Sequence, residues 1–182
     1  MERLEKILAI AAELGFSHCG ALDPKALSFR PEVRAMCEEN RCGHYAKTWT
    51  CPPGCGTLED ITARAARYTG GVIVQSTGEL EDNFDVETML ETGKLQAERF
   101  DALVPRVRAL FPDCLPMSAG GCERCRPCSY PDAPCRFPLL AFPSMEAYGL
   151  IVADVCRDSG MEYYYGPGTI TYTSCILLGA AE

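Results

Sequence analysis

Four cysteines in residues 122–135 are the part of this 182-residue chain whose types and spacing most clearly indicate chemistry. Cys122, Cys125 and Cys128 are each separated by two residues, so a tight loop can direct all three thiolates at one inorganic cluster. Cys135 follows after six further residues and is the candidate fourth ligand. We call residues 122–135 the second cysteine loop. Its spacing predicts an iron–sulfur cluster of the [4Fe-4S] type.

The spacing also defines the alternatives for this loop. Bacterial ferredoxins place the fourth cysteine closer to the third, and there it ligates another cluster, so Cys135 is less fixed by the pattern than the first three cysteines. Zinc is the main alternative, because Zn²⁺ also accepts four thiolates. Zinc sites are usually built from two separated C-x2-C pairs, whereas this loop has three cysteines in one run. The pattern therefore favours iron–sulfur over zinc, and packing alone is the weakest explanation.

An upstream group consists of Cys37, Cys42, Cys51 and Cys55, and we call residues 37–55 the first cysteine loop. Its two separated pairs suit zinc, while a cluster here would stand beside the second cysteine loop and give an electron path with two centres. The spacing leaves both metals open. A redox dithiol at Cys51 and Cys55 is less favoured, because the pair lacks the C-x-x-C interval of thioredoxin-like proteins.

Other side chains near the two loops are candidates for supporting roles. Arg124, Arg126 and Arg136 are positioned to bind a cluster by screening its negative charge, although an ordinary solvated loop also explains them. His44 is a candidate ligand in the first cysteine loop, but a lone histidine is more often a hydrogen-bonding surface residue. Cys114 is close enough in sequence to the second cysteine loop to be a spare ligand.

The total of twelve cysteines requires either an oxidising compartment or a metal. Residues 1–14 carry acids on both sides of a short apolar run, which indicates an amphipathic helix and not a signal peptide. No apolar stretch approaches the roughly 18 residues of a membrane span. We therefore expect a soluble cytoplasmic protein with reduced thiols. Cys19, Cys156 and Cys175 fall in predicted strands or helices and are expected to pack in the core.

The charge and the missing motifs exclude several classes of function. A net charge of −8, with 17 basic against 25 acidic residues, argues against a nucleic-acid partner, because phosphate binding needs a basic stripe. The sequence holds no phosphate-binding G-x-x-x-x-G-K-S/T loop, no dinucleotide G-x-G-x-x-G turn and no G-x-S-x-G nucleophile elbow. It identifies no catalytic residue and no membrane partner, and it is compatible with a homo-oligomer.

Periodicity predicts the elements that must position the loops. Apolar residues at helical spacing predict helices over residues 1–14, 57–68, 85–111 (bent or divided at Pro105) and 144–160. Short or alternating apolar runs predict strands over 16–22, 72–76 and 114–119, the last at a sheet edge because of Pro116, and a hairpin of 161–165 with 169–178. Residues 29–56 show no regular pattern and would be ordered by metal. The expected fold is α/β: a single compact domain, residues 1–182, with a small mixed sheet of four or five strands, flanking helices and two cysteine-rich metal-binding loops.

Three longer motifs carry a resemblance to a known family: Cys37…Cys42-Gly43-x-Tyr45…Trp49-Thr50-Cys51-Pro52-Pro53, Gly121-Cys122-x2-Cys125-x2-Cys128…Cys135-Arg136-x-Pro138, and Pro143-Ser144-Met145-Glu146-Ala147-Tyr148-Gly149. They resemble the bacterial and archaeal predicted metal-binding proteins of domain-of-unknown-function family 2284, and the likeness covers nearly the whole chain. The resemblance implies metal at both loops, with a lean toward iron–sulfur at the first, and a family found largely in anaerobes. It implies no substrate.

Together these observations predict an iron–sulfur protein with one or two [4Fe-4S] clusters that passes electrons to or from a partner redox enzyme. Zinc is the alternative cofactor at the first cysteine loop. Two other functions remain open. One is a zinc-stabilised interaction module. The other is an enzyme whose cluster keeps an open iron site because Cys135 does not ligate it.

Overall fold

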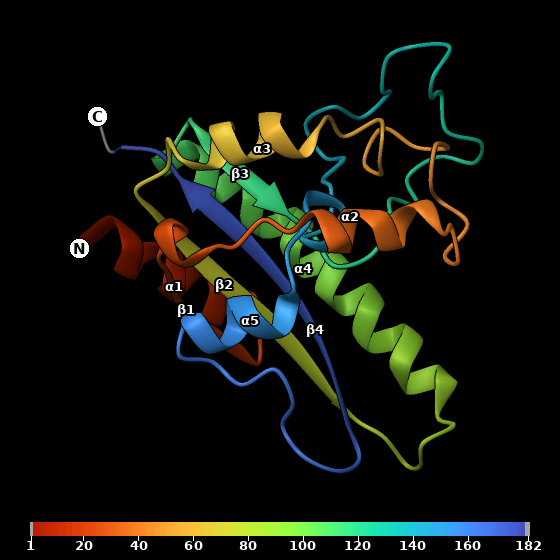
Figure 1. The fold of residues 1–182 in the computed structure, drawn as a ribbon. Helices are drawn as coiled ribbons and strands as arrows, with labels where there is room; N and C mark the ends of the chain where they lie inside the picture. The colour runs from red at the N-terminus through yellow and green to blue at the C-terminus, as the bar shows by residue number, and fades with distance from the viewer. Residues whose placement is uncertain (1, 181–182) are drawn as a thin grey trace.

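A computed structural model describes residues 2–180 and shows one sheet with helices on both faces (Figure 1). The strands lie in the order β1 (His18–Leu22), β2 (Gly70–Glu79), β4 (Thr169–Leu178) and β3 (Cys114–Met117). The central pair, β2 and β4, is in register along its whole length, from Gly70 opposite Leu178 to Glu79 opposite Thr169. The α/β class and the single domain are confirmed. The sheet is antiparallel at every pairing, not mixed as expected.

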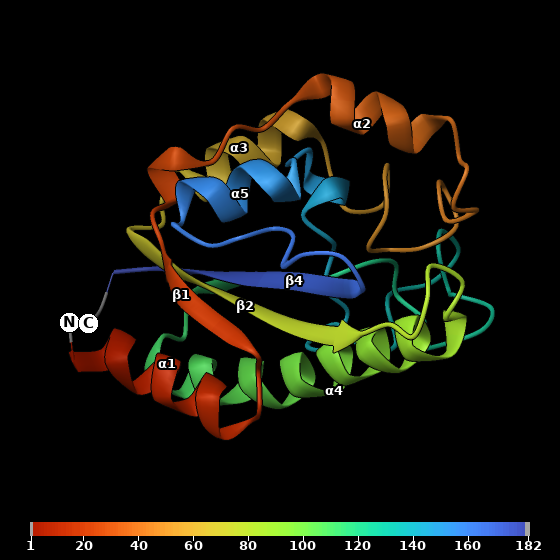
Figure 2. The same cartoon turned by 90° about the horizontal axis from the view of Figure 1, so that it is seen from below.

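The two faces of the sheet are covered by different helices (Figure 2). Helices α1 (Glu2–Glu13) and α4 (Val86–Leu110) pack on one face. The other face carries α3 (Leu58–Ala65), α5 (Val152–Asp158), the short 3-10 helix η2 (Glu146–Tyr148) and, further out, α2 (Pro31–Glu38). A further 3-10 turn, η1 (Pro24–Ala26), follows β1.

Apolar side chains of the central strands point alternately to the two faces of the sheet, so each face has its own hydrophobic core. Val72 and Val74 of β2 point to α1 and α4, whereas Ile73 between them points to the opposite cluster. Successive side chains of a strand lie on opposite faces, so one apolar strand serves both cores. Phe100 of α4 and Met145 beside η2 are among the largest fully buried side chains on the two faces.

Several predicted element ends are confirmed. Thr57 caps α3 in a capping box, in which its hydroxyl accepts from the Asp60 amide at 3.1 Å and the Asp60 carboxylate faces the Thr57 amide. Asp85 caps α4 by accepting from the Thr88 amide at 3.0 Å. The β3 strand that contains Pro116 lies at the sheet edge, as expected of a residue without an N–H. Pro105 does not divide α4, which runs as one helix from Val86 to Leu110.

Two stretches differ from the predicted elements. Within the segment expected to be irregular, α2 forms with Pro31 at its start, where a missing N–H costs nothing. The predicted helix 144–160 is two pieces, η2 and α5, because the chain reverses at Gly149 with φ of +86°. A side chain at this position would lie 2.8 Å from Leu58 and 3.0 Å from the Arg30 carbonyl oxygen, so only glycine fits.

The predicted hairpin of 161–165 with 169–178 is wrong in its first half. Residues 161–165 are not a strand, while 169–178 is β4. The reason is that β4 already pairs with β2 on one side and with β3 on the other. Segment 161–165 is held instead by side chains: Tyr165 stacks on His18 with ring centroids 3.9 Å apart, and its hydroxyl donates to Gln75 Oε1 at 2.8 Å.

Both cysteine loops lie side by side at one end of the fold, seen at the upper right of Figure 1 and at the right of Figure 2. The first cysteine loop connects α2 to α3, and the second follows β3. The sheet thus brings together two segments that are far apart in the sequence.

Candidate metal centre

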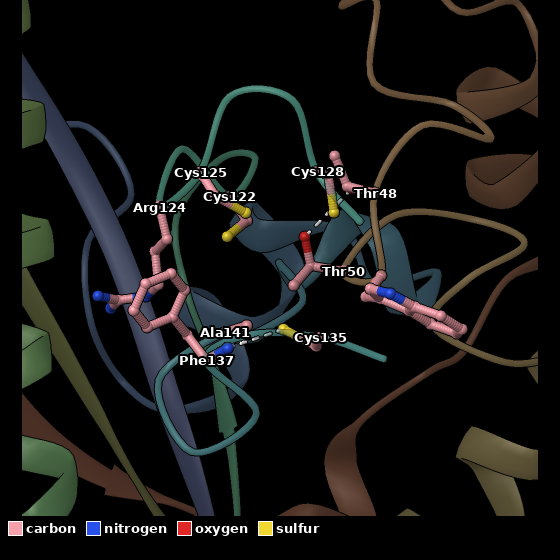
Figure 3. A pocket seen from close by; sticks show the side chains of 10 residues that line it. Thr48, Thr50, Cys122, Arg124, Cys125, Cys128, Cys135, Phe137 and Ala141 are labelled. Carbon is pink, nitrogen blue, oxygen red and sulfur yellow. Dashed lines mark hydrogen bonds between the residues drawn. The ribbon is translucent and has the colours of Figure 1, made fainter. Parts of the chain in front are cut away.

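The four predicted ligands of the second cysteine loop line one cavity (Figure 3). Cys122 and Cys125 place their sulfurs on one side, Cys128 lies across from them, and Cys135 closes the cavity from a third direction. The remaining lining is mostly apolar or from the first cysteine loop: Thr48, Trp49, Thr50, Arg124, Phe137 and Ala141. The two loops therefore build this cavity jointly.

The four sulfurs face a shared space (Figure 3). Among residues 2–180, no three histidine, cysteine, aspartate or glutamate side chains come together tightly enough to hold a single metal ion. A lone Zn²⁺ needs all four sulfurs at about 2.3 Å from one centre. An inorganic cluster is larger, because each cysteine binds a different iron at its periphery. Four thiols around a shared cavity are a donor set that fits a thiolate-bound metal centre, either a cluster or zinc.

Backbone N–H groups are directed at two of these sulfurs. The Phe137 amide donates to Cys135 Sγ at 3.4 Å. Desolvation raises the pKa of the Cys128 thiol, but hydrogen bonds from the backbone of Tyr130 and Trp49, with further bonds from Cys125 and Ser129, outweigh it and lower that pKa overall. Such donors stabilise a thiolate and are the kind of contact that tunes a bound cluster.

The net shift is in the opposite direction at Cys122, whose pKa is raised overall. Desolvation raises the pKa of its thiol, and the hydrogen bond from the Arg124 backbone together with the Arg124 charge offsets only part of this rise. A positively charged metal centre would reverse that balance, because it stabilises the thiolate directly. We therefore expect Cys122 to be a neutral thiol without metal and a thiolate when a metal centre is bound.

The three arginines of the second cysteine loop occupy different places. Arg124 lines the cavity, donates from Nε to the Leu140 carbonyl at 2.7 Å, and is ion-paired with Asp101 of α4. Arg126 forms an exposed ion pair with Glu123 at 2.8 Å. Arg136 donates to the Pro127 carbonyl at 3.1 Å. Arg124 thus anchors the loop to the helix behind it, whereas the other two arginines lie at the surface of the loop.

The first cysteine loop is tied to the folded body through Arg34, a residue that the sequence analysis did not select. Its guanidinium donates to the Ala147 carbonyl at 2.6 Å, to the Gly56 carbonyl at 2.7 Å and to Cys55 Sγ at 3.5 Å. Arg34 lies one helical turn before Cys37 on α2, so both side chains share a face. That i, i+3 spacing is the signal that could have identified it.

The thiols of the first cysteine loop lie near one another. Burial raises the pKa of Cys37, the charge of Arg34 opposes this, and Cys42 and Cys51 are close enough to raise it further. Burial also raises the pKa of Cys55, again against the nearby charge of Arg34, and Cys51 adds to that rise. Cys51 thus affects the pKa of both Cys37 and Cys55, and Cys42 affects the pKa of Cys37.

The two loops together line a hollow of about 620 Å³. Cys42 and His44 line it from the first cysteine loop, opposite Cys122, Cys125 and Cys128 of the second. The His44 ring lies against Gly121, where a Cβ would come within 3.2 Å of it. Trp49 extends the contact by donating from Nε1 to the Ala133 carbonyl at 3.0 Å. Its ring also meets Tyr130 edge to face, with centroids 4.9 Å apart.

The other cysteines lie away from the loops. Cys114 sits at the start of β3, 7% exposed within the α1 and α4 core, and it lines neither the cavity nor the hollow, so the structure gives it no place as a spare ligand. Cys156 and Cys175 are fully buried in the opposite core, and Cys19 is partly buried. The expectation that these three pack as apolar residues agrees with their positions.

Comparison with known proteins identifies one family. The model of the family described as predicted metal-binding protein, domain of unknown function 2284, matches residues 20–178. No curated protein and no solved structure matches the chain. Both cysteine loops lie inside the matched range. Among residues 2–180, no helix has the length and apolar character needed to cross a membrane.

Proposed function

The chain belongs to the predicted metal-binding family of domain of unknown function 2284, and from this premise we propose that it is an iron–sulfur protein that transfers electrons to or from a redox partner. Cys122, Cys125, Cys128 and Cys135 are the proposed ligands of a [4Fe-4S] cluster. Cys37, Cys42, Cys51 and Cys55 are the proposed ligands of a second centre, either a cluster or zinc.

One observation carries the proposal. The four thiols of the second cysteine loop face a common cavity from several directions, with N–H donors directed at the sulfurs of Cys128 and Cys135. When bound there, a [4Fe-4S] cluster supplies one-electron redox chemistry whose potential depends on such hydrogen bonds and on burial. The chain's own residues hold the thiolates, orient them and limit the access of water.

The position of the cavity suits exchange of electrons with another protein. Residues 131–134 and 136–139, which surround Cys135, are all exposed. Only a thin layer of this loop therefore separates the cavity from solvent or from a docked partner. The first cysteine loop borders the same region, so a second cluster there would extend the electron path.

The zinc-stabilised module is the second candidate, and the cores argue against it. Both faces of the sheet carry large buried side chains, each of which contributes roughly 1.5–3 kcal/mol of burial free energy. None of the four cysteines of the second cysteine loop belongs to either core. The body therefore has a source of stability that does not require metal.

Metal and sulfide analysis of anaerobically purified protein tests the proposal. A brown protein that contains iron and acid-labile sulfide in equal amounts is the expected result. Colourless protein loaded with zinc at both loops would refute it. Cys135→Ser separates the electron carrier from the enzyme with an open iron site: it should damage an all-cysteine cluster, whereas a three-cysteine cluster should assemble unchanged.

A further inference from the structure

The first half of α4 has an apolar side that is open to solvent. Val86 and Leu90 are one turn apart on this side and are 58% and 69% exposed. Gly93 and Ala97 continue the same side over the next two turns, and Phe84, just before the helix, is 87% exposed. We call these five residues the apolar flank of α4. Large apolar side chains that gather on a surface commonly mark an interaction site.

The apolar flank leads to the proposed metal centre. Leu90, Gly93 and Ala97 line a groove of about 490 Å³, and Cys122 lines the same groove. Cys122 also lines the cavity of the four thiols, whereas Cys135 does not line the groove. The start of α4 and the second cysteine loop lie at the same end of the molecule, at the right of Figure 2. A protein docked on the flank would therefore approach the metal centre from the side of Cys122.

The surroundings of the flank are strongly acidic. Residues 79–98, which include the turn before α4 and its first half, carry seven acidic residues and one lysine, so most of the net charge of −8 lies here. That lysine, Lys94, is itself ion-paired with Glu98 at 3.8 Å. At the other end of the groove, the charges of the second cysteine loop are balanced in the ion pairs described above. The uncompensated charge around the flank is therefore negative.

Charge decides which occupant suits this surface. In a symmetric dimer the same patch meets itself, so a second copy of the chain would bring acidic residues against acidic residues. A basic partner would instead gain from the same charges, while apolar residues at the centre of its contact face would cover the apolar flank.

We propose that the apolar flank of α4 and the groove beside it are the docking surface for a positively charged redox protein. Its contact face would have apolar residues inside a ring of lysines or arginines. This inference rests on the proposed function, which supplies the reason for a redox partner next to Cys122. Docking itself depends on α4 and not on which metal the cysteines hold.

Cytochrome c is the probe for this surface, because it is a small redox protein with lysines around an apolar haem edge. Its binding to the metal-loaded full chain is measured by calorimetry, and the affinity should fall as salt is added. Leu90→Ser should weaken binding about tenfold, as loss of one well-covered apolar side chain predicts. Leu95→Ser is the matched control, since Leu95 is 44% exposed on the same helix but does not line the groove. The control should bind like the wild type.

A second pair of variants tests the charge. Glu87→Gln with Glu91→Gln removes two exposed acids beside the flank and should weaken binding about fivefold at low salt. Glu2→Gln with Glu5→Gln makes the same change in net charge on α1, which lies at the left of Figure 2, away from the start of α4. This control should change the affinity less than about twofold, because distant exposed charges are screened.

Three results would overturn the docking surface. They are absence of probe binding at low salt, equal effects of the two members of either variant pair, and a wild-type dimer in sedimentation that Leu90→Ser converts to monomers. Iron and sulfide are measured in the same samples. Protein without iron that still binds the probe at the flank would refute the proposed function alone, whereas protein with a cluster that fails to bind would refute the docking surface alone.

Discussion

The two cysteine loops are held in different ways. The first cysteine loop is fixed to the folded body, since Arg34 joins α2 to Gly56 and to Ala147 of η2. The second leaves an edge strand, and its thiols face a cavity whose other wall is supplied by Thr48, Trp49 and Thr50 of the first. The difference indicates a dependence in one direction: the first loop can form without the second, whereas the second needs the first.

The largest expected effect comes from removing a ligand of the second cysteine loop. Cys125→Ser should eliminate the centre in this loop, because serine is a poor substitute for a thiolate ligand of iron–sulfur clusters. The metal of the first loop should remain, since none of its ligands changes. Metal content and visible absorption measure this result. Loss of both metals in Cys125→Ser would contradict the one-way dependence.

Arg34→Ala should have the next largest effect, and it should reach both loops. It leaves the Ala147 and Gly56 carbonyls without their donor, which costs roughly 1–3 kcal/mol in the free energy of unfolding. Urea unfolding measures the loss, and metal analysis of the same samples should show reduced occupancy at both centres.

Arg41→Ala is the control for that variant. Arg41 is paired with Glu39 at 2.7 Å, but its side chain is 86% exposed, so the pair contributes little to stability. The control should unfold like the wild type. If Arg34→Ala reduces metal only at the second loop, the assignment of Arg34 to the first is wrong.

Trp49→Phe should have a smaller effect that is confined to the contact between the loops. It removes the hydrogen bond to the Ala133 carbonyl while keeping an aromatic ring against Tyr130, for a loss of about 0.5–1.5 kcal/mol. Trp49 is also the one tryptophan of the chain. Its fluorescence in the wild type should therefore fall when a cluster assembles in the cavity beside it, and unchanged fluorescence on loading would argue against a cluster at this place.

Metal removal should have the smallest effect on the body of the protein. The two cores on either side of β2 and β4 contain no ligand of the second cysteine loop, so the sheet should keep its circular dichroism and a cooperative thermal transition after anaerobic chelation. The melting temperature should fall, because metal binding to the native state is linked to stability. Complete unfolding on chelation would favour the zinc-stabilised module.

Much of the fold could be predicted from local signals. The caps at Thr57 and Asp85 and the edge position of Pro116 depend on neighbouring residues, which the sequence displays directly. The pairing of β4 on both sides could not be predicted in this way, because its partners β2 and β3 are far from it in the sequence. For the same reason the segment containing Tyr165 looked like a strand and is not one.

The candidate metal centre, like the fold, could be predicted where it depends on residues close in sequence and not where it depends on distant ones. Spacing was sufficient to select the thiols of the second cysteine loop, since residues so close in sequence share a loop in any fold. Spacing could not show that Trp49 lines their cavity or that Arg34 donates a hydrogen bond to Cys55. These contacts join segments that only the fold brings together. Proximity in sequence also left a ligand role open for Cys114, whereas β3 carries its side chain into the core.

Mössbauer spectroscopy of anaerobically purified protein from cells grown on isotopically enriched iron tests the central claim most directly. For a cluster held by Cys122, Cys125, Cys128 and Cys135, the wild-type spectrum should contain a [4Fe-4S] component that is absent from Cys125→Ser. A wild-type spectrum without any cluster component, from protein that holds zinc in the second cysteine loop, would contradict the account.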